Sequence, residues 1–207
     1  MLGGYGATRT SAQVVYNMLN PSAGAELPPN YPAQDYGRLL DHTRKAGVGV
    51  IGIRVLAGGA LHGSTERHPI ASPPPEPIGP AMSREADITR ARRLMAIVQE
   101  GYAASLTEAA TRFVISHKAI NTILVAIAAQ HQFENAVAAV EKGPLPPAAL
   151  DRLSTANHAD HCASSASPIC KPMMQGPSEA GSSTFILNVR NCPMPSVGER
   201  TGRFASM

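Results

Sequence analysis

The sequence predicts an α/β fold in which helices cover a short parallel sheet. Three runs of apolar residues, over 12–19, 48–55 and 122–127, carry this prediction, because each run is continuous. A strand with one solvated face alternates polar and apolar residues, whereas the strands of a parallel sheet are buried on both faces. Helical patterns separate the three runs, which is the order of repeated strand–helix units.

The first half of the chain contains two of these strands. Asn20-Pro21 ends the first apolar run, and a loop rich in proline follows over 21–34. A short amphipathic helix is predicted over 33–46, and Gly47 is a typical residue to end it. The second strand then leads directly into a stretch containing Gly58, Gly59 and Gly63, and a loop extends over 64–82.

The second half is predicted to be mainly helical around the third strand. Helices are expected over 83–101, 106–117, 130–142 and 147–156. Ser83 and Ser105 are suited to cap the first two, and Ser105 with Glu108 matches the S-x-x-E capping box. We expect a solvated basic face on the first of these helices, formed by Arg90, Arg92 and Arg93.

The composition changes after residue 157. All three cysteines lie beyond this point, every tyrosine lies before it, and Ser, Pro and Gly dominate. We therefore expect one domain over 1–157 and an irregular, low-complexity and disordered tail over 158–207. The potential metal ligands of the tail match no zinc-binding spacing, so no metal site is predicted from His158, Asp160, His161, Cys162 and Cys170.

Composition and charge exclude several classes of protein. The 207 residues carry a diffuse formal charge of +3, which does not indicate a nucleic-acid partner. The most apolar stretch, 48–61, is far shorter than the ~20 residues of a membrane span, so we expect no membrane association. The N-terminus does not resemble a secretory signal, and three cysteines without a CxxC pair do not form a disulfide framework. A soluble, cytoplasmic protein is expected.

Six motifs occur in an order and spacing that resemble the C-terminal half of an aldo/keto reductase. The motifs are Gln13–Pro21, Gly47–Gly63, Leu106–Val114, Thr122–Ile127, Gln132–Asn135 and Glu141–Leu145. The resemblance covers about 12–156 and implies a partial (β/α)8 TIM barrel, made of strands six to eight with their covering helices. A whole barrel takes ~250 residues, so we expect a truncated form that lacks strands one to five.

The resemblance implies an NAD(P)-dependent oxidoreductase that reduces aldehyde, ketone or sugar carbonyls, or catalyses the reverse oxidation. Members of the family use an Asp, Tyr, Lys and His set on their early strands, and no position of this chain matches that set. Tyr5 precedes the matched region, and Tyr16 has no Lys or Asp near it in the sequence. We therefore predict no catalytic residue and no reductase activity for the chain alone, although its family is one of enzymes.

The resemblance assigns the nicotinamide side of a cofactor site to two stretches. Gln13 matches the glutamine that holds the nicotinamide carboxamide, and Ile53 takes the place of an aromatic residue that packs on the nicotinamide ring. Arg54 stands where the family usually has serine, and it either contacts the site or forms a buried salt bridge. Leu56 and Gly58 belong to the loop that wraps the pyrophosphate, although the glycine is equally suited to a simple turn.

The adenine side is expected on the last matched helix, with contacts from Gln132, Glu134 and Asn135, unless these residues only form a solvated helix surface. The serine and the basic residue that usually bind the 2′-phosphate of NADP are not evident, so NADP and NAD both stay open.

A second hypothesis is a non-catalytic binding or assembly module. Three strands with free edges and an uncovered inner face favour pairing with another chain, including self-association. Under the first hypothesis the partners are a nicotinamide cofactor and a small carbonyl substrate in the complete enzyme.

Overall fold

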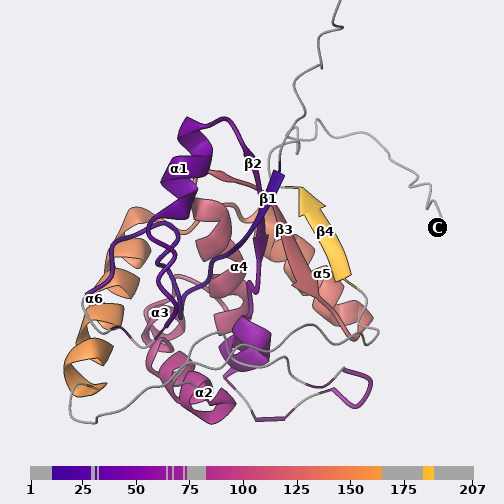
Figure 1. Ribbon diagram of the computed structural model, residues 1–207. Coiled ribbons are helices and arrows are strands. Elements are labelled where there is room, and N and C mark those ends of the chain that lie inside the picture. Colours follow the sequence, from indigo (N-terminus) through magenta and orange to yellow (C-terminus); the bar gives the residue numbers. More distant parts are fainter. Residues whose placement is uncertain are drawn as a thin grey trace, which may run out of the picture.

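The fold is built on one four-stranded sheet with the order β1-β2-β3-β4. The computed structural model describes residues 11–28, 31, 33–63, 65, 66, 68–71, 73, 83–164 and 184–188. Strands β1 (Ser11–Val15), β2 (Gly49–Ile53) and β3 (Ile120–Ala126) are mutually parallel. Strand β4 (Thr184–Asn188) runs antiparallel beside β3, at the right of the sheet in Figure 1.

Helices connect the parallel strands, so the predicted α/β class and parallel sheet are confirmed. They are α1 (Leu39–Lys45), the 3-10 helix η1 (Ala57–His62), α2 (Arg84–Arg93), α3 (Ala96–Gln99), α4 (Leu106–Ser116), α5 (Gln130–Glu141) and α6 (Pro147–Ser164). In Figure 1, α1 and α6 lie to the left of the sheet, and α2 lies at the bottom beside η1.

The two faces of the sheet differ in burial. Alternate strand residues are buried on one face, namely Val14, Val50, Gly52, Ile123 and Val125. A Cβ atom added at Gly52 would lie 3.1 Å from a methyl carbon of Val114, so α4 covers this face closely and glycine allows the approach. The other face, called the open face, is formed by Gln13, Ile51, Ile53, Thr122 and Leu124. These five side chains are half-buried or exposed, whereas Val15, which pairs with Ile53 on the same face, is buried.

The single helix predicted over 83–101 is divided into α2 and α3, and two element boundaries differ from the prediction for reasons of backbone geometry. Strand β1 ends at Val15 instead of residue 19, because Asn17 and Asn20 form a tight turn with a bridge between them. Helix α1 begins at Leu39 instead of residue 33, because Gly37 and Arg38 have φ of 55° and 56°. These left-handed values are incompatible with a right-handed helix.

The end of the chain also differs from the expected irregular tail in two places. Helix α6 continues to Ser164, seven residues beyond the predicted boundary at 157, and Thr184–Asn188 forms β4. The remainder of the predicted tail lies outside the described residues, as do the side chains of its potential metal ligands.

The predicted helix caps are confirmed. Ser83 Oγ accepts a hydrogen bond from the Ala86 amide, and Ser105 Oγ accepts one from the Glu108 amide, both at 3.1 Å. The reciprocal bond of the capping box is shifted by one residue, since Glu108 Oε2 accepts from the Ala104 amide at 3.3 Å. Both helices therefore begin where the sequence placed them.

The predicted solvated face is wrong at Arg90. This side chain is buried, and its Nη2 donates to the Leu19 carbonyl at 2.9 Å and to the Tyr31 hydroxyl at 2.7 Å. Asp87 lies 3.6 Å away on the same helix. Arg90 thus ties α2 to the loop after β1, a long-range contact that the helix sequence does not reveal.

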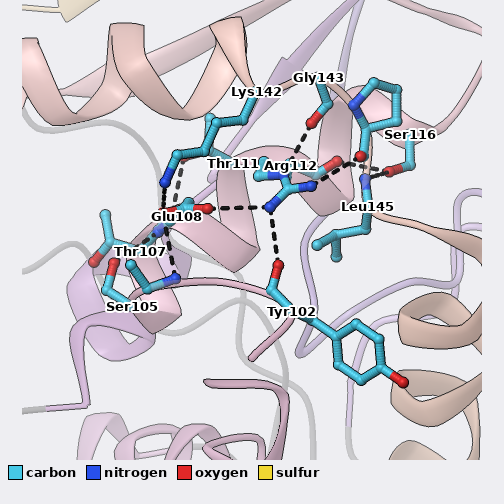
Figure 2. Close-up of polar contacts among 12 residues, drawn as sticks. Tyr102, Ser105, Thr107, Glu108, Thr111, Arg112, Ser116, Lys142, Gly143 and Leu145 are labelled. Atoms are coloured by element: carbon cyan, nitrogen blue, oxygen red, sulfur yellow. Dashed lines mark hydrogen bonds and ion pairs between the residues drawn. The ribbon is translucent and has the colours of Figure 1, made fainter. Parts of the chain in front are cut away.

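Arg112 joins α4 to the loop before that helix and to the loop after α5 (Figure 2). Its Nε donates to the Gly143 carbonyl at 3.0 Å, its Nη1 to the Tyr102 carbonyl at 2.9 Å, and its Nη2 to the Pro144 carbonyl at 3.2 Å. Glu108 pairs with Arg112 at 3.1 Å and with Lys142 at 2.7 Å. This cluster holds the loops before α4 and after α5, and with them the helix that covers the sheet.

Arg112→Met should lower the free energy of unfolding by about 2–3 kcal/mol, because it leaves carbonyl oxygens without their charged donor. Urea denaturation followed by circular dichroism measures the change. Arg44→Met is the control, since Arg44 is exposed on α1, and a shift within about 0.5 kcal/mol is expected there. Equal unfolding midpoints for the two variants would show that the cluster is not a structural anchor.

Candidate functional site

The candidate site lies at the carboxyl edge of the parallel strands. Strands β1, β2 and β3 end at Val15, Ile53 and Ala126, and because they are parallel their following loops emerge at the same edge. In barrels built from such units, this edge is where ligands bind. The loops are residues 16–20, the segment leading into η1 and the turn before α5, and Figure 1 shows η1 at this lower edge.

Gln13 and Ile53 share the open face near this edge. Gln13 pairs in register with Ile51, and Val15 pairs with Ile53, so Gln13 lies one side-chain row from the strand ends. The Gln13 side chain is exposed, whereas Ile53 is half-buried. A carboxamide supplies both a donor and an acceptor, and the neighbouring isoleucines supply an apolar surface. The face can therefore receive a flat ligand that has one polar substituent.

Arg54 follows β2 directly in an unusual backbone conformation. Its φ is 57°, in the left-handed region that few non-glycine residues adopt. Burial lowers the pKa of its guanidinium, and the nearby Tyr36 hydroxyl opposes that shift. Arginine stays charged at neutral pH even so. The segment after β2 therefore carries a half-buried positive charge near Tyr36.

Asn17 fixes the backbone at Arg54, a role that the sequence analysis missed. Its Nδ2 donates to the Arg54 carbonyl at 2.9 Å, and its Oδ1 accepts from the amides of Leu19 at 3.0 Å and Asn20 at 2.9 Å. Asn17 is buried, so these bonds are shielded from water. An asparagine directly after an apolar strand is the signal for such a turn.

The loop after Arg54 is a compact left-handed segment. Ala57, Gly58 and Gly59 have φ of 48°, 65° and 92°, a left-handed conformation that favours glycine. The amides of Ala57 and Gly59 donate to the carbonyls of Arg54 and Leu56, each at 2.8 Å. The Leu56 side chain is half-buried and packs against the core, and its role in cofactor binding stays a prediction. A role of Gly58 in ligand binding stays a prediction beside its role in this turn.

The three candidate adenine contacts all lie on α5, and two of them have local partners. Gln132 Oε1 accepts from the Ala128 amide at 2.8 Å, and Glu134 Oε1 accepts from Gln130 Nε2 at 2.7 Å. Asn135 is exposed. Gln132 thus serves as a cap for the start of α5, which favours the alternative of a structural helix surface for that residue. A role of the three residues in adenine binding stays a prediction.

Tyr16, which directly follows β1, is a core residue. Tyr16 is buried, its ring stacks on Phe113 with centroids 5.0 Å apart, and burial raises the pKa of its hydroxyl. A tyrosine in this environment is poorly suited to give up its proton. Among the described residues there is also no group of three or more His, Cys, Asp or Glu side chains placed to hold a metal ion.

Within the described residues, no helix combines the length and the apolar character needed to cross a membrane.

Asn17→Ala should lower the free energy of unfolding by about 1–3 kcal/mol, because it removes buried hydrogen bonds on both sides of the amide. Asn17→Asp keeps the acceptor but loses the donor to Arg54, so an intermediate loss is expected. The matched control is Asn135→Ala on the exposed surface of α5. Urea unfolding curves compare the three variants, and an Asn17→Ala curve that coincides with the Asn135→Ala curve would contradict the assigned role.

Comparison with models of protein families identifies the family of these residues. The model of the aldo/keto reductase family matches residues 7–158 of the 207. The match includes β1, β2 and β3, their connecting helices and every candidate site residue. A search of curated proteins found none that matches the chain.

Proposed function

The chain belongs to the aldo/keto reductase family, and from this premise we propose that it supplies the cofactor-binding side of an NAD(P)H-dependent oxidoreductase in the cytoplasm. Members of this family generally use NAD(P)H to reduce aldehyde, ketone or sugar carbonyls, or catalyse the reverse oxidation. The observation that carries the proposal is the placement of Gln13, Ile53 and Arg54 at one carboxyl edge.

Gln13 and Ile53 form the nicotinamide side of the proposed site. The exposed carboxamide of Gln13 pairs with the carboxamide of the nicotinamide, since each group has one donor and one acceptor function. Ile53 offers an aliphatic surface to one ring face, and Ile51 extends that surface on the open face. When it is bound, NAD(P)H supplies the hydride for carbonyl reduction.

Arg54 and the η1 loop form the phosphate side of the proposed site. A guanidinium binds phosphate oxygens through charge-assisted hydrogen bonds that are stronger than neutral ones. Asn17 holds the Arg54 carbonyl, so the residue that carries the charge has a fixed backbone. The left-handed glycines at 58 and 59 let a phosphate approach the main chain closely.

The proposal leaves proton transfer outside this chain. The resemblance places the family's Asp, Tyr, Lys and His set on early strands, and Tyr16 is a buried core residue. The chain therefore binds and orients a cofactor without donating the proton that carbonyl reduction requires. NADP and NAD are both compatible with the proposal, because the residues that usually recognise the 2′-phosphate are not evident.

Arg54→Asn should weaken the binding of NADPH or NADH at least about tenfold, because it removes a charged donor from the phosphate side. Asparagine tolerates the left-handed conformation, so the variant is expected to keep the loop. Isothermal titration of the purified chain with each nucleotide measures the affinity, and added salt should reduce it.

Arg38→Asn is the matched control for this titration. Arg38 has nearly the same left-handed φ, but its guanidinium is exposed and pairs with Asp41 on α1. Unchanged affinity is expected for this variant, and carbonyl reduction by the chain alone should be undetectable with either nucleotide. Cofactor binding that is absent, or equally weakened by both variants, would contradict the proposed site.

The open face supports a second candidate function. Ile51, Ile53 and Leu124 are half-buried rather than buried, so they present apolar surface on one side of the sheet. Such a surface suits a non-catalytic module that assembles with another chain. A stable, monodisperse dimer that ignores both nucleotides in the same titration would favour this candidate over a cofactor-binding role.

A further inference from the structure

The outer edge of β3 is occupied by a strand of opposite direction. Strand β4 pairs with β3 from Thr122 opposite Asn188 to Ala126 opposite Thr184. Every other pair in the sheet is parallel. Within the described residues, β4 is thus the one antiparallel strand of a sheet that is otherwise built from strand–helix units.

The sequence explains why this segment can add to the sheet. Thr184, Phe185 and Ile186 are residues of high strand propensity, and they stand in a region otherwise dominated by Ser, Pro and Gly. Because Thr184 lies opposite Ala126, β4 starts at the carboxyl edge where β3 ends. An antiparallel strand can pair from that position without a covering crossover helix.

The pairing has a direct consequence for association. The exposed amides and carbonyls of one strand edge can pair with only one neighbour at a time, and an open edge is a template for another chain. We propose that β4 is an intramolecular edge cap, which keeps β3 from pairing with a second copy of this chain. In a closed (β/α)8 barrel all neighbouring strands are parallel, so β4 also has to leave before a parallel strand can continue the sheet beyond β3.

This inference does not depend on the proposed cofactor site. It rests on the register between β3 and β4 and on the direction of β4. Hydrogen exchange of β3 and self-association of the chain test the edge cap, whereas nucleotide binding tests the cofactor site. The two ideas are therefore separated by different measurements on the same protein.

The test removes the strand while keeping the full chain. In the double variant Ile186→Pro/Leu187→Pro, both residues lose the backbone N–H, so β4 loses a donor to β3 whichever of the two amides points toward β3. Proline is also poorly tolerated within a strand. Hydrogen–deuterium exchange of the peptide that covers Ile120–Ala126 reports the pairing of β3. Sedimentation velocity over a range of concentrations reports self-association. Ala180→Pro, outside the described strands, is the matched control.

In the double variant at low concentration, we expect the most slowly exchanging amides on the outer edge of β3 to exchange about tenfold faster than in the unaltered chain. At high concentration the variant should associate, and protection of Ile120–Ala126 should return as copies pair at that edge. The unaltered chain and Ala180→Pro should show exchange in this peptide that does not depend on concentration.

Identical exchange of Ile120–Ala126 in all three proteins would overturn the proposal, because β4 would then not protect β3. Faster exchange without any concentration-dependent association would also overturn it, because β4 would pair without restraining association. If the double variant does not fold, a chain ending at residue 183 replaces it, and a synthetic peptide of residues 182–190 is added. That peptide should restore protection of β3, a peptide of scrambled order should not, and equal effects of the two peptides would overturn the edge cap.

Discussion

The guanidinium of Arg112 is the contact on which the arrangement of the sheet and its helices depends. It bonds to three main-chain carbonyls, at Tyr102, Gly143 and Pro144, while Glu108 holds its charge (Figure 2). These bonds fix both ends of the path from α3 through α4 and β3 to α6. With α4 fixed, Gly52 lets β2 approach that helix closely, and the strands are most deeply buried on the face that α4 covers. The open face follows from this packing, and the carboxyl edge follows from the parallel direction of β1, β2 and β3.

Asn17 has a similar role on a smaller scale, because it joins the loops after two neighbouring strands. One amide group holds the turn after β1 and the carbonyl of Arg54 after β2. The half-buried Arg54 and the left-handed glycines after it directly follow Ile53, the last residue of β2, and Asn17 fixes the backbone where this segment begins. A polar amide, an apolar face and a fixed cation in this order suit a ligand with a flat ring at one end and phosphates further along.

The sequence was most informative where structure is set by near neighbours. The three continuous apolar runs predicted the parallel strands, and Ser83 and Ser105 predicted the starts of two helices, since a cap depends on residues only a turn away.

The predictions that were wrong depend on partners far away in the sequence or on a positive φ angle. Arg90 is buried by a carbonyl and a hydroxyl some sixty to seventy residues earlier in the chain, and no helical pattern carries that information. The positive φ angles of Gly37 and Arg38 make α1 shorter than the helix that the spacing of apolar residues predicted. The antiparallel pairing of β4 with β3 joins segments about sixty residues apart in the sequence. The candidate site residues Gln13, Ile53, Arg54 and Gly58 come from the family resemblance, and their roles stay predictions. The bonds of Asn17 depend on the geometry of the turn after β1, which the resemblance does not give.

The central claim is that the carboxyl edge of this chain holds a nicotinamide cofactor, and amide chemical-shift mapping tests it most directly. A proton–nitrogen NMR spectrum of the labelled chain is recorded during titration with NADPH and, separately, with NADH. The account predicts saturable shifts that concentrate on Gln13 and on the segment from Ile53 to Gly59, with little change at the exposed surface of α1. Saturable shifts confined to other elements, or none at all in a folded chain, would contradict it.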